Sequence, residues 1–286
     1  MKILFSLVMV SLLATVQASA LDVLVTVLPH ASLIERLGGG AVTVHVLVGP
    51  GESPATFDPT PHQLQRLAPS QVWFTTGAPL EAALEPRLDS MIPGLEVVAT
   101  HADLAPLTLC DHHHEGEHHD HGETDPHVWL SLRNTARQAT IMAAGLERHL
   151  PDQAPQIKAN LATLLNELTA LDAELTTMLA PIAGRTLLVF HPAFGYFAHD
   201  YGLVQKAVEQ GGLAPSPRHL TQLLMDVEAQ GVRTVFVQPQ SSDRAIRPIA
   251  QEAGLEVLVL DPLARDHLAN LRHLGVTILA GLEDPS

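Results

Sequence analysis

The residues best suited to chemistry form a histidine-rich tract in the middle of the chain, within CDHHHEGEHHDHGETDPHVWL (residues 110–130). Six of the eleven residues 111–121 are histidine, and the others are aspartate, glutamate and glycine. Imidazole nitrogens interleaved with carboxylates are a ligand set for borderline divalent metals, Zn²⁺ above all. A solvated acidic loop is the alternative interpretation. The density of histidine, in a tract that lies inside the chain and is therefore not a purification tag, favours metal contact.

A second kind of candidate lies where apolar runs end. The tract leads into a turn, DPH (125–127), that places His127 before an apolar segment. Three more apolar runs end beside a proline, at His30, His191 and Asp261. In open α/β sheets, ligands bind beyond the carboxyl ends of strands, and a proline sets the backbone direction there. Each of these residues alone is more often a turn or cap residue. Together, two from each half of the chain, they are predicted to line a cleft between lobes.

The remaining histidines outside the tract are interpreted as surface or packing residues (His45, His101, His149, His199, His219, His267 and His273), with His62 ambiguous.

Short apolar runs rich in valine and leucine are typical of buried parallel strands. Such runs cover residues 22–27, 42–48, 71–76, 96–100, 186–190, 204–208, 234–238 and 256–260. Helical periodicity lies between them, for example at 31–37, 61–67 and 217–230. Alternation of strand and helix predicts an α/β fold with mostly parallel sheets flanked by helices.

One long helical pattern separates the two sets of strands. Leucine and other apolar residues recur at spacings of three and four over residues 154–180. At about 1.5 Å per residue this helix is about 40 Å long, the width of a small domain. We therefore expect a rigid helix at 151–181 that joins an N-terminal lobe (21–150, with the tract at 111–121) to a C-terminal lobe (182–286). An ordinary core helix of a single domain is the alternative.

The N-terminus has the features of an export signal. Lys2 precedes an almost wholly apolar run, and Ala18-Ser19-Ala20 has the small residues of a cleavage site. The run is short for a membrane span, which takes about 20 residues. Cys110 is the single cysteine, so the fold has no internal disulfide. We expect cleavage after Ala20 and a protein of the bacterial periplasm, without membrane insertion.

Composition narrows the classes of function. A net charge of −15 argues against binding to nucleic acid or to anionic membranes and suits cations. The 4% aromatic content argues against an aromatic-lined sugar or nucleobase site. The sequence contains no Gly-x-Ser-x-Gly, no P-loop, no His-Glu-x-x-His and no Gly-x-Gly-x-x-Gly after a strand. The sequence therefore predicts a binding protein rather than an enzyme.

Several motifs resemble the zinc-binding proteins of ABC importers, within the cluster of solute-binding proteins that also includes manganese binders. The resemblance covers essentially all of the chain after the export signal. It rests on the acidic histidine tract and on five segments: VGPGESPATFDPTP (48–61), DPHVWLS (125–131), FHPAFGYFA (190–198), VFVQPQ (235–240) and LDPL (260–263). The resemblance implies two α/β lobes joined by a long helix, with one metal ion between them.

The resemblance also implies a ligand set. His127, His191 and Asp261 fall on three of the family's ligand positions, and histidine rather than glutamate at 191 is typical of the zinc members. The family usually has a histidine after the proline of the Gly-Pro-Gly loop, where this chain has Ala55. A methyl group cannot bind metal, so the fourth position is left to His30, His62, a histidine of the tract, or water. We expect His30 to fill or border it, although His30 could equally cap a helix starting near Ser32.

The sequence thus predicts periplasmic capture of Zn²⁺ and its delivery to an inner-membrane ABC permease, by a protein that is expected to be a monomer. The histidine tract would act as a flexible secondary collector of zinc. Two different functions remain open at this point. Three protein ligands and a water would also make a catalytic zinc site, and a periplasmic zinc buffer or chaperone would need no permease.

Overall fold

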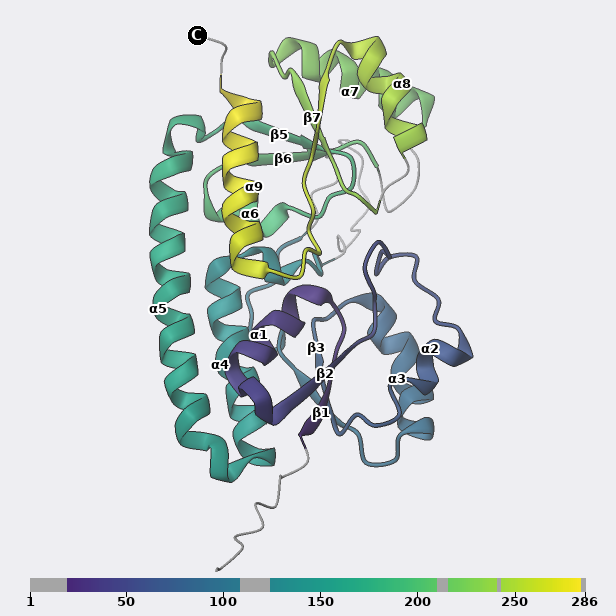
Figure 1. Cartoon of the computed structure of the whole chain (residues 1–286). Helices are drawn as coiled ribbons and strands as arrows, with labels where there is room; N and C mark the ends of the chain where they lie inside the picture. The colour runs from purple at the N-terminus through teal and green to yellow at the C-terminus, as the bar shows by residue number, and fades with distance from the viewer. Residues whose placement is uncertain (1–19, 109–123, 210–215, 241–242, 284–286) are drawn as a thin grey trace, which may run out of the picture.

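The computed structural model describes residues 20–108, 124–209, 216–240 and 243–283 of the chain. The expected export signal and the histidine tract (111–121) lie outside the described residues. Two α/β lobes follow each other along a single long helix (Figure 1). Each lobe contains one four-stranded sheet, and every strand pair in both sheets is parallel. The predicted fold class is therefore confirmed.

The strands match the eight apolar runs to within about two residues at each end. Those of the N-terminal lobe are β1 (Leu21–Val25), β2 (Val42–Val46), β3 (Val72–Thr75) and β4 (Glu96–Ala99). Those of the C-terminal lobe are β5 (Thr186–Val189), β6 (Val204–Ala207), β7 (Thr234–Val237) and β8 (Glu256–Val259). All four residues of β3 and of β7 are buried, as expected for parallel strands covered on both faces.

The two sheets have the same strand order, β2-β1-β3-β4 and β6-β5-β7-β8. In each sheet the first strand of the lobe is central, and the chain moves to opposite sides of it in successive crossovers. The carboxyl ends of parallel strands at such a reversal form the usual ligand-binding crevice of an open α/β sheet. His191, which follows β5, is thus placed where a ligand site is expected, whereas Asp261 follows the edge strand β8.

The helices connect the strands and cover the sheets. They are α1 (Leu28–Gly38), α2 (Pro61–Gln65), α3 (Pro79–Met91), α4 (Leu132–His149), α5 (Ala154–Leu179), α6 (Gly195–Asp200), α7 (Pro217–Ala229), α8 (Asp243–Ala253) and α9 (His267–Leu282). Helix α1 begins at Leu28 rather than near Ser32, because Pro29 occupies its first turn, where a missing N–H costs nothing. Gly39, with φ of 53°, ends it. No described helix combines the length and apolar character that a membrane span requires.

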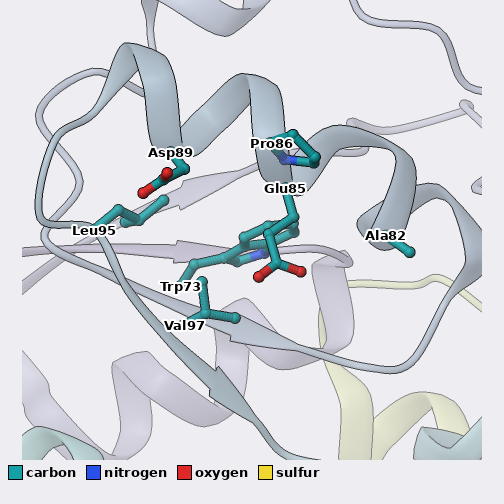
Figure 2. A pocket seen from close by; sticks show the side chains of 7 residues that line it. All are labelled: Trp73, Ala82, Glu85, Pro86, Asp89, Leu95 and Val97. Carbon is teal, nitrogen blue, oxygen red and sulfur yellow. The ribbon is translucent and has the colours of Figure 1, made fainter.

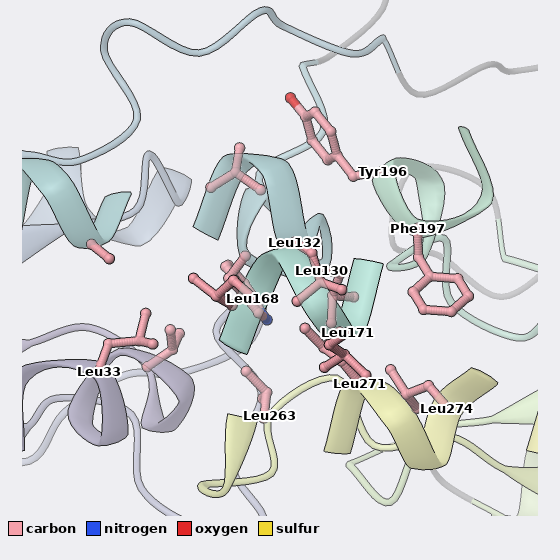
Figure 3. Packing of buried hydrophobic residues seen from close by; sticks show 14 of the residues in the cluster. Leu33, Leu130, Leu132, Leu168, Leu171, Tyr196, Phe197, Leu263, Leu271 and Leu274 are labelled. Carbon is pink, nitrogen blue, oxygen red and sulfur yellow. The ribbon is translucent and has the colours of Figure 1, made fainter. Parts of the chain in front are cut away.

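Helix α5 packs against both lobes. Its buried residues recur along one face (Ile157, Leu164, Leu168, Leu171, Leu175 and Leu179). That face contacts α1 and α4 of the N-terminal lobe and α9 of the C-terminal lobe (Figure 1). A single hydrophobic cluster joins these helices, with Leu33, Leu168 and Leu271 among its members (Figure 3). The long helix therefore holds the lobes together through a continuous core, and this core fixes how the two lobes sit against each other.

Candidate metal centre

Two of the four predicted ligands lie side by side. The ring centroids of His127 and His191 are 5.4 Å apart, with the ring planes at 79°. His127 precedes a short 3₁₀ helix, η2 (Val128–Leu130), in the N-terminal lobe. His191 follows β5 and Phe190 in the C-terminal lobe. The pair therefore brings one imidazole from each lobe to the same place.

Asp125 fixes the orientation of His127. Its Oδ1 accepts hydrogen bonds from the backbone N–H of His127 at 2.9 Å and from Nδ1 at 2.7 Å. The aspartate is buried, and its Oδ2 lies so close to Gly195 that a Cβ there would be 2.4 Å away. Because Nδ1 is occupied, Nε2 is the ring nitrogen left to bind a metal. A carboxylate on the second nitrogen is the usual support of a metal-binding histidine.

His191 has the same arrangement with a different partner. Its Nδ1 lies 2.8 Å from Oε2 of Glu209, which follows β6. The side chain of Gln238 accepts a bond from the backbone N–H of His191 at 3.3 Å and donates one to its carbonyl at 2.9 Å. The backbone and ring of His191 are therefore both held, and Nε2 is again the nitrogen that remains for a ligand.

Asp261 is held through one carboxylate oxygen. Its Oδ1 accepts hydrogen bonds from Nε2 of Gln240 and from the backbone N–H of Leu263, both at 2.9 Å. Asn270 donates to the Asp261 carbonyl at 2.7 Å. Oδ2 is left for another partner. In the described part of the chain, however, no three His, Cys, Asp or Glu side chains are grouped as a complete metal site.

Trp129 links the loop of Asp261 to that of His127. Its indole N–H donates to the carbonyl of Pro262 at 2.8 Å, and its ring lies 5.4 Å from that of His127. The carboxylate thus belongs to a loop tied to the histidine pair, even though the three side chains do not form a closed coordination shell.

His30 has a different environment from the histidine pair. It is fully buried, its ring is 6.5 Å from that of Trp129, and neither ring nitrogen has a hydrogen-bond partner among the described residues. Burial, and then the nearby His267, lower the pKa of His30 to about 3, so the ring is neutral at neutral pH. The expectation that His30 could cap the helix is wrong, because the N-cap of α1 is Val27. The assignment of His30 to the fourth ligand position stays a prediction.

The remaining candidates for the fourth position differ in exposure. His62 is exposed in the first turn of α2. Ala55, at the position of the missing histidine, is exposed in a turn. Among the histidines interpreted as surface or packing residues, His267 is buried against Thr135, and the side chain of His199 is 67% exposed.

The described residues that flank the histidine tract in the sequence are tied to the turn of His127. Thr108 and Thr124 form an antiparallel bridge, and the backbone N–H of Asp125 donates to the carbonyl of Leu107 at 2.7 Å. The backbone N–H of Leu107 donates in turn to the hydroxyl of Tyr196, in the C-terminal lobe, at 3.0 Å. The described segments on both sides of the tract are therefore held together beside Asp125, the partner of His127.

Sequence reasoning missed Glu209 and did not assign a role to Asp125 or Gln240. The apolar run 204–208 ends at Glu209, so the strand-end position that marks His191 and Asp261 also marks this residue. Glu209 has no neighbouring proline, however, and a rule that requires one excludes it.

A pocket of about 390 Å³ lies between α3 and β4, where Glu85 and Asp89 stand above Trp73 and Val97 (Figure 2). None of the candidate ligands lines it. This pocket is therefore separate from the candidate metal centre.

Comparison with known proteins identifies the class of protein and then its family. A model of the family described as "Zinc-uptake complex component A periplasmic" (ZnuA) matches residues 23–278. A crystal structure of ZnuA is 34% identical, with a TM-score of 0.85 over 93% of this chain and all of that chain. A zinc-bound deletion mutant of ZnuA, also 34% identical, gives a TM-score of 0.86 over 94% of this chain and all of that chain.

Curated relatives are more distant. The zinc-binding protein AdcA of Streptococcus pyogenes serotype M3 is 26% identical over 84% of this chain, which spans 50% of the length of AdcA. A metal-binding protein of Chlamydia muridarum, described as putative, is 24% identical over 87% of each chain.

Two lobes on a long helix, with imidazoles on facing loops, define a solute-binding protein of the metal-binding class. The chain belongs to the ZnuA family, the periplasmic component A of zinc-uptake complexes. This is a family of substrate-binding proteins rather than of enzymes. A component of an uptake complex has zinc as its ligand and a transporter as its partner.

Proposed function

We propose that the chain captures Zn²⁺ between its lobes through His127, His191 and Asp261 and delivers it to an inner-membrane ABC permease. The observation that carries this proposal is the pair of His127 and His191. Their ring centroids are 5.4 Å apart, and Nδ1 of each ring is hydrogen-bonded to a carboxylate. Membership of the zinc-uptake family supports zinc as the ligand.

The chemistry of the proposed ligands suits zinc. Neutral imidazole nitrogens bind Zn²⁺ at about 2.0–2.1 Å and a carboxylate oxygen at about 2.0–2.2 Å, in tetrahedral geometry. Nε2 of His127 and Nε2 of His191 would each take one position, and Oδ2 of Asp261 a third. The Asp261 carboxylate would complete this set by moving to within bonding distance of the ion. His30 is kept as the candidate for the fourth position, with His62, a tract histidine or water as the alternatives.

Zinc is cargo in this proposal, not a catalytic centre. Membership of a family of zinc-uptake components supports transport of the ion rather than its retention. We further propose that residues 1–20 are an export signal cleaved after Ala20, that the protein works in the periplasm, and that it is a monomer. The histidine tract (111–121) would collect zinc more weakly and pass it to this site.

Calorimetric titration with zinc separates the proposed site from the tract. Deleting residues 111–121 should leave one tight equivalent and remove weaker ones. Replacing both His127 and His191 by Ala in the deleted protein should abolish the tight equivalent. If the deletion alone removes tight binding, the tract supplies a primary ligand and His30 is not the fourth one.

A further inference from the structure

Glu209 is the partner of His191 that sequence reasoning did not find. Its Oε2 lies 2.8 Å from Nδ1 of His191, and both side chains are sheltered, at 23% exposure for His191 and 18% for Glu209. This contact joins residues 18 positions apart in the chain. The two residues are thus brought together by the fold and not by a local turn.

The sheet itself places Glu209 beside His191. The backbone N–H of Val208 donates to the carbonyl of Val189 at 2.9 Å, and that of Glu209 donates to the carbonyl of Phe190 at 2.9 Å. These bonds continue the parallel register of β5 and β6 beyond the last residues of both strands. The Glu209 backbone is therefore held in position up to the point where its side chain meets the imidazole.

An ionised carboxylate can only accept hydrogen bonds. Because Oε2 of Glu209 faces Nδ1, the proton of the neutral His191 ring belongs on Nδ1, and the lone pair belongs on Nε2. A ring without this partner could carry its proton on either nitrogen and could rotate. The contact thus selects both a tautomer and an orientation, and it makes Nε2 more electron-rich.

Two further carboxylate–histidine hydrogen bonds among the described residues use the opposite nitrogen, and a looser contact of His199 Nδ1 with Asp200, at 3.7 Å, lies beyond hydrogen-bond distance. His45 contacts Asp22, and His149 contacts Glu96, through Nε2 in both cases. His127 and His191 contact their carboxylates through Nδ1. Short Nδ1 hydrogen bonds on two facing, sheltered rings distinguish this arrangement from an ordinary surface ion pair, which contributes little.

We infer that Glu209 is a positioning residue for zinc binding, which holds His191 as the Nδ1–H tautomer with Nε2 directed to the metal. This inference rests on the proposed function, since it takes His191 as a zinc ligand. The His191 ring is then prepared before zinc arrives, so binding costs no reorientation. Loss of such a supporting contact typically weakens metal binding by about 10- to 100-fold.

The test uses the full chain with Glu209→Gln and Glu209→Ala, and with Glu96→Gln as the matched control at His149. The first readout is the ¹⁵N chemical shifts of the His191 ring in zinc-free protein at a pH where the ring is neutral. We expect a protonated Nδ1 in the parent protein and in Glu96→Gln, and a mixture of tautomers in Glu209→Ala. Glu209→Gln, which keeps an oxygen acceptor, should lie between them.

The second readout is zinc affinity by competition with a chelator. We expect a loss of about 10- to 100-fold in Glu209→Ala, a smaller loss in Glu209→Gln and none in Glu96→Gln. The inference would be overturned if Glu209→Ala kept the tautomer of the parent protein and bound zinc within about twofold of its affinity. Such a change is well short of the loss expected for a supporting contact. Zinc affinity is measured for His191→Ala in the same way. If this variant leaves zinc affinity unchanged, the proposed ligand set fails. If it weakens binding while both Glu209 variants bind normally, only the role of Glu209 is wrong.

Discussion

The indole N–H of Trp129 donates a buried hydrogen bond to the carbonyl of Pro262, at 2.8 Å, and so joins the two lobes at the candidate metal centre. Trp129 is two residues beyond His127, and Pro262 directly follows Asp261. The two loops are therefore tied together by a contact that needs no metal ion. We expect binding to involve small movements of side chains rather than a large closure of the lobes.

Trp129→Phe should test this link, because it removes the N–H and leaves the Pro262 carbonyl without its donor. We expect a loss of about 1–3 kcal/mol in unfolding free energy. Zinc affinity should fall by up to about tenfold, because the loop of Asp261 is no longer held against that of His127. A tenfold loss corresponds to about 1.4 kcal/mol of binding free energy. Denaturant unfolding and chelator competition measure the two effects.

Trp73→Phe is the matched control. The Trp73 indole N–H donates to Oγ1 of Thr26 at 3.1 Å, wholly within the N-terminal lobe. This change should also reduce stability but should leave zinc affinity unchanged. Equal losses of affinity in both variants would mean that the Trp129 bond has no specific role at the site.

The protein should prefer zinc to manganese. His127 and His191 offer nitrogen, whereas manganese sites favour oxygen ligands, and zinc binds more tightly than manganese to such donors in general. Competition titration with both ions at neutral pH measures the ratio. A preference for manganese would contradict the proposed function.

His191→Ala should weaken zinc binding by more than the roughly 10- to 100-fold that loss of a supporting contact causes. His199→Ala, further along the chain and with its side chain 67% exposed, should have no measurable effect. Chelator competition on the two variants gives the comparison. Similar losses in both would mean that position at a strand end does not identify ligands in this chain.

Stability of the zinc-free protein should fall as the pH is lowered. Burial lowers the pKa of His267 to about 4, and its Nε2 lies 3.2 Å from Oγ1 of Thr135. The unfolded chain, with a histidine pKa near 6.5, therefore binds a proton between about pH 6.5 and 4 that the folded chain does not. The contribution of His267 to stability is lost across this window and levels off below it.

His267→Gln should reduce the slope of unfolding free energy against pH between about 6.5 and 4. His273→Gln, at an exposed position of the same helix, should leave the slope as it is. Denaturant midpoints measured at several pH values with a chelator present decide this. An unchanged slope in His267→Gln would show that the buried ring does not cause the acid sensitivity.

Much of the fold can be predicted from the sequence because buried parallel strands are short and continuously apolar. The eight runs mark β1 to β8, and the leucine spacing over residues 154–180 marks α5. The sequence pattern places the start of α1 too late, near Ser32, because the periodicity is visible only after Pro29, whereas the proline itself lies in the first turn.

The candidate site can be predicted only in part. His191 and Asp261 are identifiable because each lies just beyond a strand and beside a proline. Glu209 is specified by the parallel register of two strands distant in sequence, and a single sequence does not show which side chains such a register brings together. The enclosed environment of His30 likewise depends on residues from other helices, among them His267, so its burial cannot be predicted from its own segment.

The most direct test of the proposed site is a zinc-edge anomalous difference map from crystals grown with one equivalent of Zn²⁺. We predict one strong peak about 2.1 Å from Nε2 of His127 and Nε2 of His191, with an oxygen of Asp261 at about 2.0–2.2 Å. The fourth ligand, His30 or another, would be visible in the same map. A principal peak away from both histidines, or one bound through Nδ1 of either ring, would contradict the proposed site.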